Sequence, residues 1–279
     1  MKSIHVILLV SVAFLAGSIV QGKYGYIGRT LNALGVRDWL VRHAYLPPKP
    51  NAVASIPKME SMAPVPSPCP SGRVFTMLVS GQSNAGGVAL DSQNRRYERI
   101  FILHNGQCYQ ATDPFPGQSG ASIWTVLGEL ILPHTDAVMI AEAFGGTTIE
   151  DFAPGGTTYA AIAKAISELR RLGLPPTVLL IQGGESDARR ETPTAYFRHY
   201  LAQLVGSLEG LPVFVARASV CGGSFSSSVR AAQEDYPGPD TDRLFGDNRI
   251  DGCHFNDQGR QKAGRLWYET LLKSGILPH

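Results

Sequence analysis

Residues 73–87 read RVFTMLVSGQSNAGG, and the rest of the chain is organised around this stretch. Its first half is an apolar run with β-branched and aromatic residues, which is typical of a buried strand. The run stops at Ser80-Gly81, and Ser83-Asn84 are residue types that cap the N-termini of helices. In open α/β sheets, ligands bind where a strand ends and a helix begins, beside free backbone N–H groups. Ser83 is therefore a candidate nucleophile, although from this stretch alone helix capping is the simpler interpretation.

The composition is that of a globular protein. With 279 residues, 44% of them hydrophobic, the chain is long enough for one core plus an N-terminal extension. A formal net charge of only +2 and the lack of a Lys/Arg-rich run argue against a nucleic-acid partner.

The N-terminus predicts export. Residues 6–20 form an uncharged apolar run, so we expect residues 1–22 to be a signal peptide or a membrane anchor. Residues 23–46 have helical spacing among basic residues, which fits a helix lying on a membrane or one packed on the main domain. Residues 47–72 are rich in Pro and Ser and indicate a linker. The basic residues after the apolar run would favour a cytoplasmic location. We nevertheless expect a periplasmic or extracellular catalytic domain at residues 73–279, with membrane association if the segment is retained.

Short apolar runs alternate with helical patterns along this domain. Further strands are expected at residues 98–104, 136–143, 175–182 and 211–216, and helices at 122–132, 159–172, 192–208 and 257–272. This alternation predicts an α/β fold with a central parallel sheet covered by helices on both faces. The carboxyl ends of its strands should meet at one edge and form the active site.

A second motif, Asp251-Gly-Cys-His254, precedes the last expected helix. A carboxylate three residues before a histidine can accept a hydrogen bond from its Nδ1, which leaves Nε2 free to take a proton from a serine. An isolated motif of this kind is common, and a lone histidine is more often structural. Its pairing with Ser83 favours a Ser-His-Asp mechanism: Ser83 as nucleophile, His254 as general base and acid, and Asp251 as the group that orients the ring.

An oxyanion hole needs donors at the same edge. The backbone N–H of Ser83 is the first candidate, and the glycines at 145 and 146, after an expected strand, allow close backbone approach. We take Gly146 as the second donor and the amide of Gln182 as the third. The candidate substrate-binding residues beside these groups are Gln82, Asn84, Gly145 and Glu185.

Four motifs resemble those of the SGNH hydrolases, in the sialate O-acetylesterase and acetylxylan-esterase-like branch. They are GQSN (81–84), FGGTTIEDF (144–152), QGGESDA (182–188) and DGCHFNDQG (251–259), in the order of that family. The resemblance implies a three-layer α/β/α, flavodoxin-like fold. It also implies hydrolysis of short acyl esters, usually acetyl groups on sugars, without a metal or cofactor. It places the nucleophile on Ser83 and the Asp-His pair on Asp251 and His254.

The third motif departs from the family pattern. Aligned on GESD, the family glutamine that serves the oxyanion falls on Gly183, and the amide is displaced to Gln182. Either a local backbone shift lets Gln182 serve, or the hole uses backbone donors and Asn84. Glu185 and Asp187 are expected to hold this loop, with a supporting contact to the catalytic pair as the alternative.

Four cysteines allow two disulfides in an exported protein, with three connectivities, and reduced thiols are the alternative. We predict Cys221–Cys253, which would brace the catalytic loop, and Cys69–Cys108, which would tie the linker to the domain. No His/Cys cluster has the spacing of zinc ligands, and no metal is expected.

The sequence thus predicts an exported serine esterase acting on acetyl groups of a carbohydrate. One alternative is an O-acyltransferase on the same scaffold. The other is a weakly active polysaccharide-binding domain, which the displaced glutamine favours.

Overall fold

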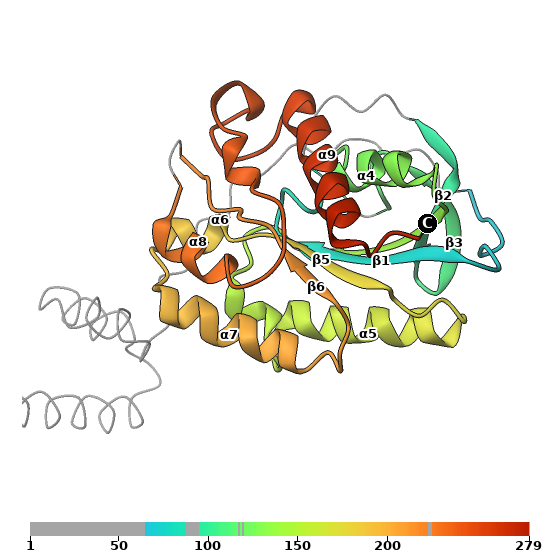
Figure 1. The fold of residues 1–279 in the computed structure, drawn as a ribbon, viewed down its shortest axis with the longest axis horizontal. Helices are drawn as coiled ribbons and strands as arrows, with labels where there is room; N and C mark the ends of the chain where they lie inside the picture. Colours follow the sequence, from blue (N-terminus) through green and yellow to red (C-terminus); the bar gives the residue numbers. More distant parts are fainter. Residues whose placement is uncertain (1–64, 88–94, 117, 119, 223–224, 279) are drawn as a thin grey trace, which may run out of the picture. The chain divides into compact units, whose positions relative to one another are not determined.

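The computed structural model describes residues 65–87, 95–116, 118, 120–222 and 225–278 (Figure 1). The expected signal peptide or anchor, the following helical segment and the linker up to residue 64 lie outside the described residues. Within the described part of the chain, no helix is both long and apolar enough to cross a membrane.

A six-stranded sheet forms the centre of the domain. Its strands are β1 (Val74–Gly81), β2 (Arg96–His104), β3 (Gln107–Thr112), β4 (Asp136–Ala143), β5 (Val178–Gln182) and β6 (Val213–Val215), in the order β3-β2-β4-β1-β5-β6. Every pairing is parallel except that of β2 with β3, so the predicted α/β fold with a central parallel sheet is confirmed. The difference from the prediction lies at one edge of the sheet, where β3 adds an antiparallel strand. The unpredicted β3 returns from β2 through Asn105-Gly106, both with positive φ, which is the geometry of a two-residue hairpin turn.

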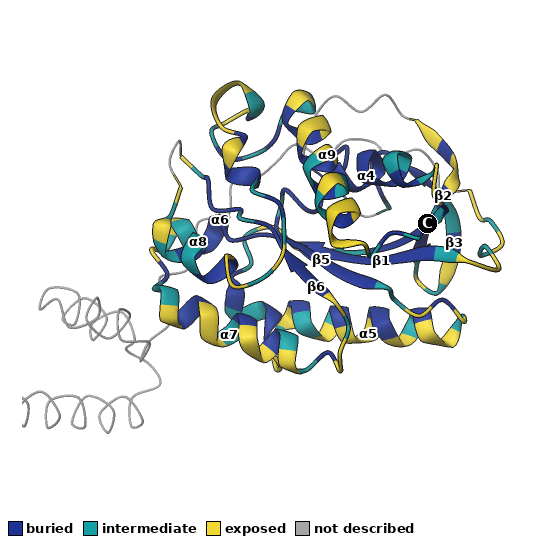
Figure 2. Ribbon diagram, viewed as in Figure 1, coloured by how far each residue is buried: buried dark blue, intermediate teal, exposed yellow. Residues whose placement is uncertain are grey.

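Helices cover both faces of this sheet (Figure 1). One layer contains α4 (Ile123–Ile131) and α9 (Asp257–Ser274), and the other contains α5 (Thr157–Arg171), α7 (Thr194–Gly206) and α8 (Ser227–Gln233). Successive residues of β1 alternate between the two cores: Met77 and Val79 pack on the α4–α9 side, and Leu78 on the α5–α7 side. Both faces of the central strands are therefore buried (Figure 2), as expected for a parallel sheet.

The chain order of the strands places the site at the end of β1. From β1 the chain passes to β2, β3 and β4 on one side and then to β5 and β6 on the other, which makes β1 the switch point where α/β sheets bind ligands. Gly81 at the end of β1 lies opposite Ala143 of β4 and Gln182 of β5. A Cβ at Gly81, where φ is +149°, would lie 2.0 Å from the carbonyl oxygen of Gln182, so this position requires glycine.

Residues 81–87, which we name the serine turn, do not start the helix that Ser83-Asn84 predicted. The N–H groups of Ala85 and Gly86 both donate to the carbonyl of Gln82, at 3.0 and 2.9 Å. The indole of Trp124 donates to the carbonyl of Ala85 at 2.8 Å, which fixes the turn against α4. Ser83 is therefore presented at the tip of a turn rather than at the cap of a helix.

Both predicted disulfides are present, Cys69–Cys108 and Cys221–Cys253, which confirms the predicted connectivity. The first joins the segment before β1 to β3, where the N–H of Ser67 also donates to the carbonyl of Cys108 at 2.9 Å. The second joins the segment after β6 to the residue that precedes His254.

Candidate active site

Ser83, His254 and Asp251 meet at the carboxyl edge of the sheet, although the first two are 171 positions apart. Ser83 Oγ lies 2.9 Å from Nε2 of His254, and Nδ1 of the same ring lies 2.6 Å from Oδ2 of Asp251. Ser83 comes directly off β1, whereas His254 lies just before Asn256, the residue whose side chain caps α9. The structure therefore brings together the three side chains that the sequence placed at opposite ends of the domain.

Asp251 fixes the tautomer of the histidine ring. Its other oxygen, Oδ1, accepts from the N–H groups of Cys253 and His254 at 2.9 and 2.7 Å. Partial burial alone would raise the pKa of Asp251, but the hydrogen bonds from His254 and Cys253 outweigh it and lower that pKa. An ionised carboxylate only accepts hydrogen bonds, so Nδ1 carries the proton and Nε2 accepts from the hydroxyl of Ser83.

Residues 248–255, which we name the histidine loop, are held by Arg249 from inside. This buried guanidinium donates to the carbonyls of Leu244 at 2.6 Å, Val220 at 3.3 Å and Thr241 at 3.3 Å, and also to that of Cys253. The guanidinium also packs over the ring of Phe255, with 4.5 Å between the guanidinium carbon and the ring centroid. The role of Arg249 was not predicted, because a single arginine in an irregular loop gives no local signal of the carbonyls to which it donates.

Asn84 joins the serine turn to the histidine loop. Its Nδ2 donates to Oε1 of Glu185 at 2.8 Å and to the carbonyl of Cys253 at 3.1 Å, and its Oδ1 accepts from the N–H of Phe255 at 3.0 Å. The side chain is buried. We expected Asn84 to contact substrate or to serve the oxyanion; in the structure its Nδ2 instead donates to Glu185 and to Cys253, and its oxygen accepts from Phe255, so the last two contacts hold the loop that carries the base.

Two other expected substrate contacts, Gln82 and Glu185, also lie inside the protein. Gln82 donates to the carbonyl of Thr147 and accepts from the N–H of Ser186 at 3.2 Å. Glu185 is fully enclosed, and burial raises its pKa although the hydrogen bond from Asn84 lowers it. Its Oε2 has no hydrogen-bond partner among the described residues.

Asp187 holds the neighbouring loop, as expected. Its carboxylate accepts from the N–H of Ile149 and from the hydroxyl of Thr192, both at 3.0 Å. Within the described residues, neither Asp187 nor Glu185 forms a hydrogen bond with Asp251 or His254; Glu185 is connected to the histidine loop through Asn84.

The predicted oxyanion donors separate into two groups. Gln182 is buried with both ends of its amide in use: Nε2 donates to Thr241 Oγ1 at 2.9 Å, and Oε1 accepts from the indole of Trp267 at 3.1 Å. Because Gln182 is still part of β5, the alternation of the strand turns its side chain toward Trp267 of α9. We therefore do not retain Gln182 as an oxyanion donor.

The backbone donors remain open to a substrate. Among the described residues, neither the N–H of Ser83 nor that of Gly146 donates a hydrogen bond to a protein acceptor. Their loops lie side by side, because the N–H of Phe144 donates to the carbonyl of Gly81 at 3.1 Å and Gln82 donates to Thr147. Gly145 is exposed, and Gly146 has a φ of +79°, which favours glycine. No group of three His, Cys, Asp or Glu in the described structure is arranged to hold a metal ion.

Comparison with known proteins gives a consistent result. The family model described as carbohydrate esterase, sialic acid-specific acetylesterase, matches residues 72–273. A solved protein from Arabidopsis thaliana superimposes with a TM-score of 0.62 at 19% identity, over 71% of this chain and 98% of that one, which shows a shared fold.

Two bacterial structures are also similar. A carbohydrate acetylesterase from Xanthomonas citri has a TM-score of 0.49 at 13% identity, over 71% of this chain and 55% of that one. A carbohydrate acetylesterase family member from Sinorhizobium meliloti has a TM-score of 0.47 at 16% identity, over 73% of this chain and 99% of that one. No curated protein matches the chain.

Proposed function

The chain belongs to the carbohydrate esterase family of sialic acid-specific acetylesterases, and from this premise we propose that it removes acetyl groups from a carbohydrate by a serine mechanism. The family match confirms the predicted resemblance to the sialate O-acetylesterase branch of the SGNH hydrolases and makes the protein an ester hydrolase. The observation that carries the mechanism is the continuous contact from Ser83 Oγ through the ring of His254 to Asp251.

In the first half-reaction, Ser83 Oγ attacks the acetyl carbonyl carbon while its proton passes to Nε2 of His254. The positive ring is stabilised by the carboxylate of Asp251. The resulting oxyanion accepts hydrogen bonds from the open backbone N–H groups of Ser83 and Gly146. Collapse breaks the bond to the sugar oxygen, which takes the proton from Nε2 and leaves as an alcohol.

The second half-reaction repeats these steps with water. His254 takes a proton from a water molecule as its oxygen attacks the acetyl-serine carbonyl, and the same N–H groups hold the second oxyanion. The proton then returns to Ser83 Oγ, and acetate leaves. With Gln182 engaged elsewhere, two backbone N–H groups supply the stabilisation, so the predicted third donor is not part of this mechanism.

Two features support an oxidising, extracytoplasmic location. The two disulfides indicate an oxidising environment, because cytosolic thiols are kept reduced. The apolar run at residues 6–20 has the length of a signal-peptide core. We therefore propose export to the periplasm or the cell exterior, with this segment either removed or retained as a membrane anchor.

Hydrolysis of p-nitrophenyl acetate tests the mechanism. Ser83→Ala and His254→Ala should each lower kcat by about 10⁴-fold or more, because they remove the nucleophile and its base. Ser207→Ala, which removes a hydroxyl at the end of α7, is the control and should keep the wild-type rate. A Ser83→Ala enzyme with the wild-type rate would refute the proposal.

Acetate release from O-acetylated glycans, measured with and without an acceptor sugar, distinguishes hydrolysis from transfer. We expect acetate to be released at the same rate with and without the acceptor. A fall in acetate release with matching acetylation of the acceptor would identify the acyltransferase instead.

A further inference from the structure

A cavity of about 570 Å³ lies beside the histidine loop and is not used by the mechanism above. Its volume is within the range of sites for small organic ligands, about 300–1,000 Å³. The lining residues that matter here are Val220, Phe225, Arg230, Asp242, Arg243 and Phe245.

The wall of this cavity is continuous with the histidine loop. Val220 precedes Cys221, which is bonded to Cys253, the residue before His254. With a Cα–Cα distance of 4.0 Å across the disulfide, the Cα atoms of Val220 and His254 are at most about 12 Å apart. Arg249 also donates to the carbonyls of both Val220 and Cys253. The cavity therefore lies beside the loop that carries His254.

The proton transfer to the leaving group determines which part of the ester lies next to His254. His254 must protonate the sugar oxygen as it leaves, so the sugar lies next to the imidazole, away from the acetyl group. A sugar chain that continues past the acetylated unit can therefore extend into the cavity.

Two exposed aromatic rings line the cavity. Phe225 and Phe245 are 61% and 63% exposed, and exposed apolar side chains gathered at a cavity mark binding surfaces. The ring of Phe225 packs over the guanidinium of Arg230, 5.3 Å from its carbon to the ring centroid, which orients the ring without covering it. Flat aromatic faces of this kind suit the C–H face of a sugar ring.

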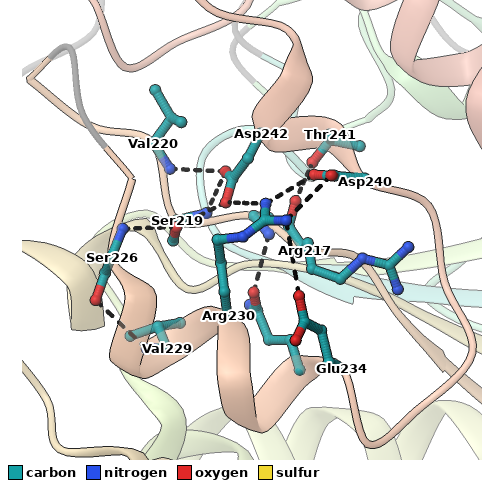
Figure 3. A network of polar contacts seen from close by, with 12 residues as sticks. Arg217, Ser219, Val220, Ser226, Val229, Arg230, Glu234, Asp240, Thr241 and Asp242 are labelled. Atoms are coloured by element: carbon teal, nitrogen blue, oxygen red, sulfur yellow. Dashed lines mark hydrogen bonds and ion pairs between the residues drawn. The ribbon is translucent and has the colours of Figure 1, made fainter.

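Arg230, on which the ring of Phe225 packs, belongs to a polar network that also includes Asp240 and Asp242 (Figure 3). Arg230 donates to both oxygens of Asp240 at 2.8 and 3.1 Å and to Asp242 at 3.0 Å. Asp242 also accepts from the N–H groups of Ser219 and Val220, at 2.6 and 2.8 Å. Because these hydrogen bonds fix the side chains to one another and to the backbone, the floor is preorganised before any ligand binds.

Arg243 is the donor that this network leaves free. It is exposed, lines the cavity and makes no ion pair with any of the described residues. A guanidinium has five N–H donors and suits either neighbouring hydroxyls or a carboxylate of a sugar.

We propose that this cavity is a saccharide subsite, which binds the sugar unit next to the acetylated one. This inference rests on the proposed function, since it assumes that His254 protonates a sugar leaving group. The phenyl rings of Phe225 and Phe245 contact the ring face of the bound unit, and Arg243 donates to its oxygens.

Kinetics on three substrates test the subsite: p-nitrophenyl acetate, acetylated xylan as a neutral glycan, and O-acetylated submaxillary mucin as an acidic one. In Phe225→Ala/Phe245→Ala, the ratio of kcat/KM on the preferred glycan to kcat/KM on p-nitrophenyl acetate should fall about tenfold, through KM. Leu272→Ala, another exposed apolar side chain but on α9, is the control and should keep the wild-type ratio. Arg243→Gln should lower the mucin ratio more than the xylan ratio if the bound unit is acidic, and both alike if it is neutral.

Mobility in gels that contain each glycan gives a readout independent of catalysis. The wild-type protein and Leu272→Ala should be retarded by at least one glycan, and Phe225→Ala/Phe245→Ala should not be. An unchanged kinetic ratio, equal retardation of the double variant, or no retardation of the wild type would each overturn the subsite. Loss of all esterase activity in the wild type with retardation intact would instead overturn the proposed function alone.

Discussion

The serine turn and the histidine loop face each other across the active site but are held in different ways. The serine turn leaves β1 at the centre of the sheet, and its own backbone hydrogen bonds close it. Apart from one isolated bridge between Arg249 and Phe255, the histidine loop has no regular structure within residues 249–255. Side-chain contacts to the rest of the domain hold it: the amide of Asn84, a disulfide to Cys221, and the guanidinium of its own Arg249, which reaches carbonyls outside the loop.

The contrast shows how the two reacting groups obtain their positions. The nucleophile is positioned by the strand that it follows, so the contacts that fold the core also place it. The base is positioned by a few long-range contacts that the core does not need. Substitutions at these contacts should therefore lower activity more than their effect on stability would suggest.

The largest effect is expected at the contact between Asp251 and the ring of His254. Asp251→Asn should lower kcat on p-nitrophenyl acetate by about 10⁴-fold, because an amide facing Nδ1 favours the wrong tautomer of His254. The melting temperature should change little, since the Asp251 side chain is 49% exposed. Asp247→Asn, an exposed carboxyl just before the loop, is the control. If Asp251→Asn keeps more than a tenth of the wild-type kcat, Asp251 does not orient the ring.

A smaller effect is expected where the two regions are joined. Asn84→Ala removes three buried hydrogen bonds and leaves the N–H of Phe255 and the carboxyl of Glu185 without this partner. We expect a loss of about 10²-fold in kcat from displacement of His254. The free energy of unfolding should fall by about 3 kcal/mol for the unsatisfied buried groups.

Asn248→Ala is the control for this change, because it removes two hydrogen bonds, to the carbonyl of Phe245 and from Lys262, at the exposed start of the same loop. It should keep most of the activity. Equal losses of kcat in both variants would mean that Asn84 acts only through general stability.

The two disulfides offer a matched pair that separates stability from positioning. They close chain segments of similar length, with sequence separations of 32 and 39 residues, so removing either should cost about 3–4 kcal/mol of unfolding free energy. Only Cys221–Cys253 reaches the histidine loop. Cys221→Ser/Cys253→Ser should therefore lower kcat several-fold at a temperature where both proteins are folded, while Cys69→Ser/Cys108→Ser should not. Denaturant unfolding and steady-state kinetics measure the two effects, and equal kcat values would show that the disulfide does not position the base.

The same contrast explains what the sequence could predict. The β1 pattern, the serine after it and the Asp-x-x-His motif are local features, and each lies where it was expected. The strand β3 was missed because its polar residues hide the alternation, although Asn105-Gly106 is a hairpin signal. The roles of Asn84 and Gln182 depend on partners 59–171 residues away, and that of Arg249 depends on carbonyls of irregular backbone, so no local pattern reveals them.

The smallest expected effect concerns Glu185, the buried carboxyl that supports Asn84. Because burial raises its pKa in the folded protein, it keeps a proton at pH values where the unfolded chain, with the ordinary pKa of 4.5, has lost it. The unfolded state then binds fewer protons, so the free energy of unfolding falls as pH rises above about 4.5 until the folded pKa is passed.

Glu185→Gln keeps an oxygen that can accept from Asn84 and removes the titratable group. The melting temperature of this variant should therefore fall less than that of the wild type as pH rises above about 4.5. Glu269→Gln, on the exposed side of α9, makes the same change of charge and should keep the wild-type slope. Melting curves across pH measure the difference. Equal slopes for wild type and Glu185→Gln would mean that Glu185 is ionised in the folded protein, with the guanidinium of Arg249 as the charge that stabilises it. In that case the serine turn and the histidine loop would be joined by an electrostatic attraction in addition to the hydrogen bonds of Asn84.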